Sequence, residues 1–192
     1  KWLMGEMGQL LAQDAFMQGL PMPAVPTRIY AGVAGPRASW LPFGMEANDG
    51  NARADGVQNS GNTIGKVVRL NRDGAPADGS ALGIWSTGHR NPQGAAVRPG
   101  TNELWITEHG PQGGDELNLV VQGGNYGWPV KSYGCNYGAP VGTACRIGGG
   151  FQAPSYVEPK SIWVPESTAP SGLLFYTGNQ FPEWNGSVLS GA

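Results

Sequence analysis

The sequence predicts an all-β protein built from short strands that are joined by tight turns. Gly and Pro contribute 32 and 16 of the 192 residues, a quarter of the chain, which is typical of a protein rich in turns. Seven Trp, six Tyr and five Phe argue against disorder, because disordered chains are poor in aromatic residues. From Ile64 onward, short apolar runs recur with turn sequences between them, a pattern that favours a sandwich, a barrel or a propeller.

Eight segments are expected to be strands, because they combine β-branched, aromatic and aliphatic residues between turn sequences such as NRDG, RPGTN and QGGN. They are IGKVVRL (64–70), ALGIWS (81–86), GAAVR (94–98), ELWIT (103–107), ELNLVV (116–121), SIWV (161–164), GLLFYT (172–177) and SVLS (187–190).

The first part of the chain has a different composition. Residues 1–18 have apolar residues at roughly helical spacing, and the sequence GLPMPAVP that follows ends any helix. Arg28 to Val33 is expected to be a short strand, and residues 34–62 to be loop. No second helix is expected. We therefore divide the chain into an unassigned segment, 1–49, with a helix and a strand, and a β domain, 50–192.

Charge and the length of the apolar runs argue against two kinds of partner, nucleic acid and a membrane. The net charge is −2, only 14% of the residues are charged, and no basic stripe is present, so nucleic acid is not expected as a partner. No apolar run approaches the roughly 20 residues that a membrane span needs. The chain begins at Lys1 without a signal peptide, as a mature or truncated product would.

Cys135 and Cys145 are the only cysteines, and they bracket a loop rich in small residues, CNYGAPVGTAC. Their spacing does not suit a zinc site, which needs two closely spaced pairs. A disulfide in an oxidising compartment is the favoured interpretation. The alternative is two unpaired thiols in a loop.

The first candidate site is the turn GHRNPQG, Gly88 to Gly94, between two expected strands. Arg90 offers five donors in a fixed fork, and Asn91 adds a donor and an acceptor. Held at a strand end, this pair would recognise a carboxylate or carbonyl oxygens. The alternative is a surface turn whose arginine caps nearby carbonyl groups.

The second candidate site is the loop TEHGPQGGDELNLV, which begins at Thr107. Gly110 and Pro111 can turn their carbonyl groups outward, and Glu108, Asp115 and Glu116 bring carboxylates. Carbonyl and carboxylate oxygens are the ligands that Ca²⁺ accepts, although the alternating acidic positions of an EF-hand loop are missing. His109 is a ligand, a base or, as we favour, a hydrogen-bonded turn residue.

Four aromatic residues gather in the segments GGNYGWPV and SYGCNYG. They are Tyr126, Trp128, Tyr133 and Tyr137. They would form a floor for a planar ligand, or they would fill the space between sheets, which is the commoner role of such residues.

Five motifs in order carry a resemblance to a known family. GHRNPQGAAVRP, ELWITEHGPQGGDELNLV, GGNYGWPV, APSGLLFYTG and FPEWNGSVL together resemble the soluble glucose/sorbosone dehydrogenases, and most closely their aldose sugar dehydrogenase branch. IGKVVRLNRDG also fits the family strand before the Arg-Asn turn. The resemblance covers about residues 50–192. It implies a six-bladed β-propeller that uses pyrroloquinoline quinone (PQQ) and Ca²⁺.

The resemblance also implies roles for individual residues. The carbonyl groups of Gly110 and Pro111 match the pair that binds the Ca²⁺ beside the quinone. Glu116 and Tyr126 match the residues that hold a second, structural Ca²⁺. Residues that match positions contacting or lying beside PQQ are Arg90, Asn91, Tyr137, Ala169, Pro170 and Ser171. His109 matches a position where relatives vary, so we assign it no catalytic role.

The chain departs from the family in its extent. The family uses a histidine in an earlier blade as its base, whereas the first histidine here is His89. No catalytic residue is therefore assigned. At roughly 40 to 45 residues per blade, residues 50–192 correspond to about three blades, so an incomplete propeller is expected. Part of the first fifty residues, PAVPTRIYAGVAGP and the later NDG, loosely resembles α/β-hydrolase lipases. A divergent blade or a disordered leader is the alternative.

The resemblance thus implies a piece of a periplasmic or secreted enzyme that oxidises aldose sugars at C1 to lactones. Ca²⁺ and Arg90 would stabilise the negative charge that hydride transfer leaves on the quinone, and a base would take the hydroxyl proton. A propeller module that binds a ligand or partner without catalysis is the first alternative. A hydrolase is the second, although the chain lacks the G-x-S-x-G motif. The sugar, the electron acceptor and the oligomeric state are not specified.

Overall fold

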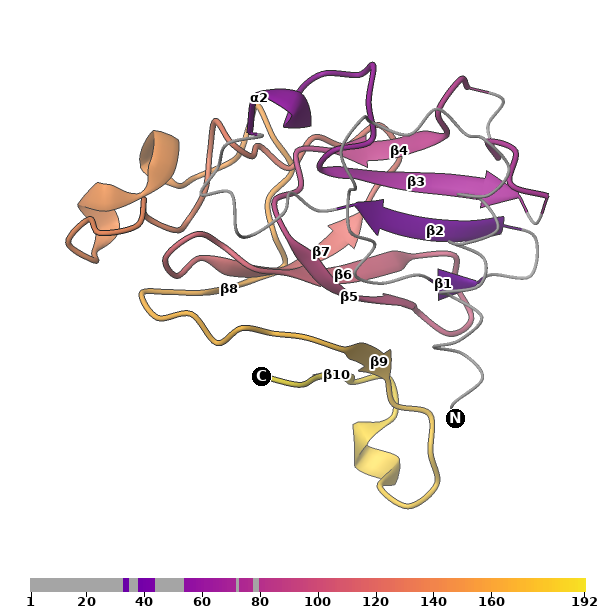
Figure 1. The fold of residues 1–192 in the computed structure, drawn as a ribbon. Coiled ribbons are helices and arrows are strands. Elements are labelled where there is room, and N and C mark those ends of the chain that lie inside the picture. The colour runs from indigo at the N-terminus through magenta and orange to yellow at the C-terminus, as the bar shows by residue number, and fades with distance from the viewer. Residues whose placement is uncertain (1–32, 35–37, 44–53, 72, 78–79) are drawn as a thin grey trace.

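A computed structural model describes residues 33–34, 38–43, 54–71, 73–77 and 80–192 of the chain. Strands dominate this part of the protein, and Figure 1 shows the two larger sheets lying one above the other. The helical elements are one turn of α-helix, α2 (Ala54–Val57), and three 3₁₀ turns at Thr143–Cys145, Ile147–Gly149 and Pro182–Trp184. The fold is therefore all-β, as the composition predicts.

The first sheet is a four-stranded antiparallel sheet in the order β1-β2-β3-β4. Its strands are β1 (Val33–Ala34), β2 (Ala38–Phe43), β3 (Lys66–Asn71) and β4 (Ile84–Thr87). The longest ladder joins β2 to β3, from the pair Ala38–Asn71 to the pair Phe43–Lys66. Each strand pairs with its neighbour in sequence, which is the connectivity of a propeller blade.

The second sheet repeats this plan in the order β5-β6-β7-β8. Its strands are β5 (Pro92–Val97), β6 (Leu104–Glu108), β7 (Asp115–Val120) and β8 (Ser161–Trp163). A register shift between Pro92 and Gly94 bends β5 against β6. A hairpin of β9 (Leu173–Phe175) and β10 (Val188–Ser190) follows, and β9 lies beside β5.

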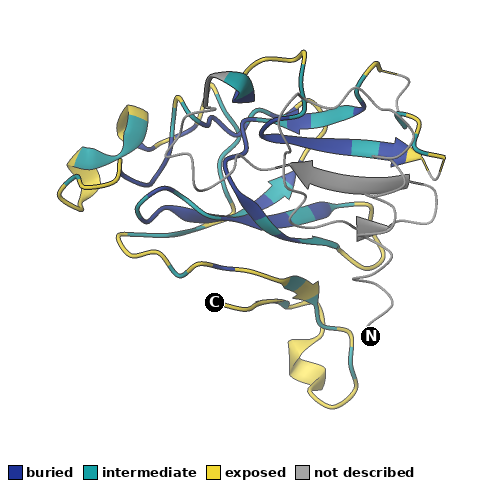
Figure 2. Cartoon of the chain, viewed as in Figure 1, coloured by how far each residue is buried: buried dark blue, intermediate teal, exposed yellow. Residues whose placement is uncertain are grey.

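The main core lies between the two larger sheets. Val67 of β3 packs there with Leu104, Ile106 and Val120 of the second sheet. In Figure 2 the buried residues follow β3 to β7, whereas the hairpin of β9 and β10 is mostly exposed. A second cluster joins Val57, Ile64 and Trp128. It packs α2 and the loop before β3 against the segment that follows β7.

All eight predicted strands are present, with bounds that differ by a few residues at each end. The expectation of a loop over residues 34–62 was wrong, because β2 and α2 lie there. The predicted helix in residues 1–18 and most of the predicted strand from Arg28 to Val33 lie outside the described residues. The division at residue 49 stays a prediction, although β2 lies before it and forms a ladder with β3.

None of the helices in the described part of the chain is both long enough and apolar enough to cross a membrane.

Candidate functional site

Two turns form the candidate site at one end of the second sheet. The turn from Gly88 to Asn91 joins β4 to β5, and the turn from His109 to Gly114 joins β6 to β7. The first turn needs a glycine at its start, because a Cβ at Gly88 would lie 2.3 Å from Asn125 Oδ1 and its φ is 82°. The segments that follow β7 and β8 are hydrogen-bonded to residues of these turns.

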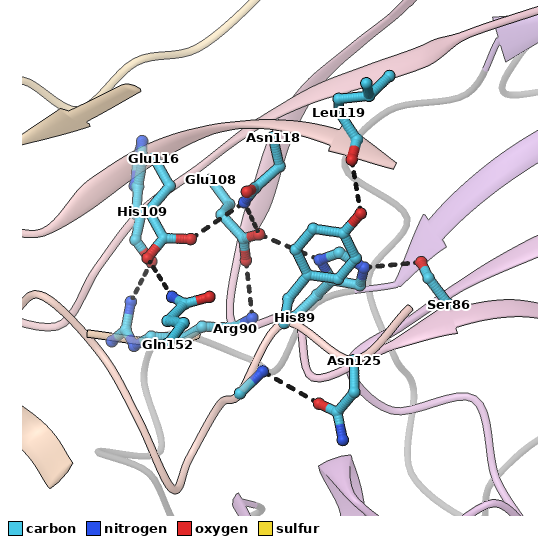
Figure 3. A network of polar contacts seen from close by, with 12 residues as sticks. Ser86, His89, Arg90, Glu108, His109, Glu116, Asn118, Leu119, Asn125 and Gln152 are labelled. Carbon is cyan, nitrogen blue, oxygen red and sulfur yellow. Dashed lines mark hydrogen bonds and ion pairs between the residues drawn. The ribbon is translucent and has the colours of Figure 1, made fainter. Parts of the chain in front are cut away.

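Glu108, at the end of β6, contacts two residues of the first turn (Figure 3). Its Oε1 contacts His89 Nδ1 at 3.0 Å, and its Oε2 accepts a hydrogen bond of 2.9 Å from the Arg90 backbone N–H. The other ring nitrogen of His89 bonds to Ser86 Oγ at 2.8 Å, and the ring stacks on Tyr126 with centroids 4.4 Å apart. His89 is wholly buried, and its contacts with Ser86, Glu108 and Tyr126 fix the position of the turn.

Glu116, at the start of β7, lies directly opposite Glu108 across the ladder. Asn118 Nδ2 bridges the two carboxylates, at 2.7 Å from Glu108 Oε1 and 3.0 Å from Glu116 Oε2. Burial would raise the pKa of Glu108, but the His89 ring and hydrogen bonds from three residues lower it below its usual value. Burial and the neighbouring Glu108 raise the pKa of Glu116 well above its usual value. The hydrogen bonds that Asn118 and Gln152 donate to Glu116 offset only part of this rise.

Unused oxygen acceptors surround Glu116. Asn118 Oδ1 and Gln152 Oε1 are buried without a hydrogen-bond partner among the described residues, while Gln152 Nε2 donates to Glu116 Oε1 at 2.9 Å. Buried acceptors of this kind normally have a partner. A small cavity of about 10 Å³ lies here, and both Glu116 and Tyr126 line it. That is room for an ion or a water, and not for a sugar or a quinone.

This donor set fits Ca²⁺, which accepts carboxylate, amide and backbone carbonyl oxygens together. In the described part of the chain, no group of three or more His, Cys, Asp or Glu side chains is arranged to hold a metal ion. An ion here would therefore depend on amide and carbonyl oxygens as well as Glu116. The Tyr126 hydroxyl is already engaged, because it donates to Leu119 O at 2.6 Å and accepts from Val121 N at 2.9 Å. Of the two oxygen atoms of Tyr126, the backbone carbonyl oxygen is therefore the one that we assign to an ion.

The Arg90 side chain lies over the second turn. Its Nη1 donates to the carbonyl oxygens of His109 at 3.0 Å and Gly110 at 2.8 Å, and its Nη2 donates to the Tyr137 hydroxyl at 3.1 Å. The guanidinium carbon lies 5.3 Å from the centre of the Trp128 ring and 5.9 Å from that of Tyr137. The Gly110 carbonyl that the resemblance assigns to Ca²⁺ is thus occupied by Arg90, although a second lone pair remains.

His109 connects two of the predicted cofactor-contacting segments, the Arg90–Asn91 pair and the segment from Ala169 to Ser171. Its backbone N–H donates to Asn91 O at 3.0 Å, its carbonyl oxygen accepts from Arg90, and its Nε2 bonds to Pro170 O at 3.1 Å. Residues 169–171 are held beside the same turn, since Thr107 Oγ1 donates to Ser171 O at 2.8 Å. His109 is therefore a hydrogen-bonded turn residue, which is the role that the sequence favours.

The loop that carries Tyr137 is closed by a disulfide between Cys135 and Cys145, whose Cα atoms are 5.1 Å apart. This pairing confirms the favoured interpretation of the two cysteines. Gln112 ties the loop to the second turn, because its Nε2 donates to Ala139 O at 2.8 Å and its Oε1 accepts from Gly138 N at 3.0 Å. Tyr137 is thereby held next to Arg90.

The structure brings most predicted site residues together. Arg90, Asn91, Tyr137 and Pro170 meet around His109, while Gly110, Glu116 and Tyr126 line one cavity. Pro111 is buried, and its ring would meet a Cβ at Gly134 at 2.8 Å. The prediction that Glu116 reaches the Tyr126 carbonyl stays a prediction. Sequence reasoning missed Asn118, which the alternation of β7 places on the same face as Glu116, and Gln152, for which no local signal exists.

Comparisons with known proteins show which proteins this chain is similar to. The model of the glucose/sorbosone dehydrogenase family matches residues 43–192. A Synechocystis protein of uncharacterized function is 41% identical over 179 residues, 82% of this chain and 42% of its own length. The aldose sugar dehydrogenase of Escherichia coli is 40% identical over 136 residues, 67% of this chain and 36% of its own length.

Solved structures agree with the sequence comparisons. The apo-form of the soluble aldose sugar dehydrogenase from Escherichia coli superposes with a TM-score of 0.69 at 35% identity, over 84% of this chain and 46% of that one. The PQQ-bound form of the aldose sugar dehydrogenase from Streptomyces coelicolor gives a TM-score of 0.54 at 29% identity, over 81% and 41%. The chain spans less than half the length of these relatives.

Proposed function

Because the chain belongs to the glucose/sorbosone dehydrogenase family, we propose that it is part of a PQQ- and Ca²⁺-dependent enzyme that oxidises aldose sugars at C1 to lactones. The observation that supports this proposal most is the position of the Arg90 side chain. The guanidinium of the buried Arg90 lies 5.3 and 5.9 Å from the centres of two aromatic rings, and it donates hydrogen bonds to the carbonyl groups of His109 and Gly110. Such a fork suits the oxygens of a planar, anionic cofactor.

We assign the residues of this chain as follows. Arg90, Asn91, Tyr137 and the segment from Ala169 to Ser171 would hold the quinone. The carbonyl groups of Gly110 and Pro111 would bind the Ca²⁺ beside it, which requires Arg90 to share or release the Gly110 oxygen. Glu116 and the Tyr126 carbonyl would hold the structural Ca²⁺. The bound quinone would accept the hydride from the sugar C1, with the adjacent Ca²⁺ polarising its carbonyl oxygens.

The chain's own contribution to that step is electrostatic and positional. Arg90 would stabilise negative charge on the cofactor oxygens, and its burial strengthens the effect. The base that takes the sugar hydroxyl proton lies outside this sequence in our proposal. We assign neither histidine as the base, because His89 is wholly buried and out of reach of a sugar, and His109 Nε2 bonds to Pro170 O.

The proposal includes the architecture of the whole protein. The two four-stranded sheets and the hairpin would be part of a six-bladed propeller, in which other blades supply the base and the remaining cofactor contacts. The loop disulfide supports an oxidising compartment such as the periplasm. We refer to the protein of family length that would contain this sequence as the full-length protein.

Activity tests the proposal directly. The 192-residue chain with added PQQ and Ca²⁺ should not reduce a dye in the presence of glucose, because the base is missing, whereas the full-length protein should. Changing Arg90 to Lys keeps the charge but removes the fork, so the full-length variant should lose activity by at least tenfold. Dye reduction by the short chain above a control without protein would defeat the assignment of the base. A full-length protein that binds a ligand and never oxidises a sugar would support the non-catalytic alternative.

Melting curves test the assignment of Glu116. In the full-length protein, the variant Glu116→Gln keeps the size of the side chain and removes its charge, so its affinity for Ca²⁺ should fall. An ion that binds only the folded state stabilises it by mass action. The wild type should therefore melt higher with Ca²⁺ than with chelator, and the variant should show little difference. Equal shifts for both proteins would show that Glu116 is not a ligand.

A further inference from the structure

Asp115, the first residue of β7, is a fully buried carboxylate that accepts four hydrogen bonds. Its Oδ1 accepts from the Gly110 N–H at 2.9 Å. Its Oδ2 accepts from Ser167 Oγ at 2.6 Å, Thr168 N at 2.8 Å and Ala169 N at 2.9 Å. All four donors are neutral backbone or hydroxyl groups. One side chain thus joins two segments that are more than fifty residues apart in the sequence.

Both segments are parts of the proposed cofactor site. Gly110 begins the turn whose carbonyl groups face the Ca²⁺ in our assignment, and Ala169 begins the segment that faces the quinone. Each oxygen of Asp115 serves one of them. Because a carboxylate is rigid and only accepts hydrogen bonds, fixing both of its oxygens fixes the separation of the two backbone segments.

The backbone at Ala169 gives independent support. Its φ is 49°, in the left-handed region, where it is the one residue other than glycine in the described part of the chain. This conformation is less favourable for an alanine than for a glycine. Such a conformation persists when the surroundings determine it, and the N–H groups of Thr168 and Ala169 are those that Asp115 holds.

Two neighbouring residues hold the rest of the segment but not its start. Thr107 Oγ1 donates to Ser171 O, and His109 Nε2 bonds to Pro170 O. These contacts fix the residues after Ala169. In the described part of the chain, Asp115 joins residues 167–169 to the Gly110 turn with both of its oxygens, which separates its effect from that of Thr107 and His109.

We propose that Asp115 is a positioning residue of the cofactor site, which sets the separation between the Gly110–Pro111 turn and the Thr168–Ser171 segment. This inference rests on the proposed function, because it assumes that the quinone binds against both of these segments. Asp115 does not contact the reacting atoms in this role. It acts through the backbone, so its loss changes cofactor affinity through geometry.

Equilibrium binding of PQQ to the full-length protein tests this role. Binding is measured by titration calorimetry at saturating Ca²⁺, at a temperature well below every melting transition. Asp115→Asn keeps the size of the side chain, but the amide nitrogen cannot accept the hydrogen bonds that one carboxylate oxygen accepted. Its Kd for PQQ should rise at least tenfold. The control is Asp73→Asn, an exposed carboxylate that accepts one bond of 3.0 Å from Ala75 N, and its Kd should not change.

A second substitution separates positioning from general stability. Adding Ala169→Gly to Asp115→Asn removes the penalty for the left-handed backbone, so it should lower the Kd again by at least threefold. A role in stability alone predicts no such recovery of affinity. Ser167→Ala removes one donor to Asp115 and leaves the carboxylate in place. This variant should raise the Kd for PQQ severalfold. It serves as the test of the positioning role if Asp115→Asn does not fold.

The outcomes distinguish this inference from the proposed function. If the wild type does not bind PQQ, the proposed function fails. If the wild type binds and Asp115→Asn binds equally well, the positioning role is wrong. If Asp115→Asn does not fold, an unchanged Kd for Ser167→Ala overturns the inference. Weaker binding without recovery by Ala169→Gly also overturns it, because the Ala169 backbone would then not be what Asp115 controls.

Discussion

Single buried polar residues fix the loops around the candidate site. Lys66 is one of them, and its burial is not predicted by the sequence. Its side chain is 1% exposed, and Nζ donates to the carbonyl oxygens of Val57 and Ile64. It thereby holds the loop between α2 and β3 in place. Burial lowers the pKa of Lys66 from 10.5 to about 8, because the charged form is the more costly one to bury.

The sign of the pH effect follows from that shift. Between pH 8 and 10.5 the unfolded state binds more protons than the folded state does, so the contribution of Lys66 makes the free energy of unfolding rise with pH. In Lys66→Met this contribution is lost. The stability of the wild type relative to the variant should therefore increase by roughly 1 to 3 kcal/mol between pH 7.5 and pH 10.5.

Urea unfolding of the two full-length proteins at several pH values measures this difference. Lys160→Met provides a control, because Lys160 is exposed. A difference between wild type and Lys66→Met that stays constant with pH would show that Lys66 does not lose its proton in this range.

At the level of single residues, prediction from the sequence depends on local patterns. Arg90 and Asn91 follow a strand within one turn, and the structure brings both beside the second turn, while their contact with a cofactor stays a prediction. The contacts of Asp115, Asn118 and Gln152 could not be predicted, because most of their partners lie in other segments of the chain. Gln152, for example, bonds to a residue 36 positions away. Lys66 lies in an expected strand, where a lysine would normally face solvent.

Strands were predictable because their residues alternate and turns flank them. β2 was missed, since its sequence ASWLPF contains a proline, which argues against a strand that pairs on both sides. In the structure this proline, Pro42, lies opposite Val67 of β3 and beyond the two residue pairs that join β1 to β2. Pairing partners could not be predicted, because register depends on contacts between segments that are distant in the sequence.

The disulfide loop is the element with the clearest energetic role. Replacing both Cys135 and Cys145 by Ser should lower the free energy of unfolding by at most about 3 kcal/mol, because the loop that the bond closes is short. Calorimetry should show a lower melting temperature for the double variant. Reductant should lower that of the wild type and leave the variant unchanged.

Mass spectrometry provides the covalent control. Peptides that contain Cys135 and Cys145 should be linked without reductant when the protein is made in an oxidising compartment. Two thiols that are freely alkylated under these conditions would rule out the bond.

At the scale of the whole molecule, the hairpin of β9 and β10 leaves apolar side chains exposed. Phe181 and Trp184 stack with ring centroids 4.6 Å apart, and each is more than 40% exposed. Leu174 and Leu189 of the hairpin strands are exposed as well. An apolar group of this kind on an open sheet edge favours association with other chains.

Sedimentation velocity should therefore show self-association of the 192-residue chain at concentrations where the full-length protein does not associate. Phe181→Ser with Trp184→Ser should reduce it. Val121→Ser with Val130→Ser is the matched control, because these residues are also exposed but lie outside the hairpin. Equal self-association of both double variants would show that the hairpin is not responsible.

The close approach of β5 to the segment before β9 has a consequence at the level of the gene. A Cβ at Gly94 would lie 2.2 Å from Ser171 O and 2.7 Å from Thr107 Oγ1, whereas a Cβ at Gly100 meets nothing within 4 Å. Every glycine codon begins with two guanines, so each nucleotide change at those two positions of codon 94 should be lost from a randomised library selected for PQQ binding. Codon 100 should instead accept changes to Asn and Asp, which tolerate its φ of 76°. Sequencing the library before and after selection measures both outcomes, and survival of alanine at position 94 would contradict the first.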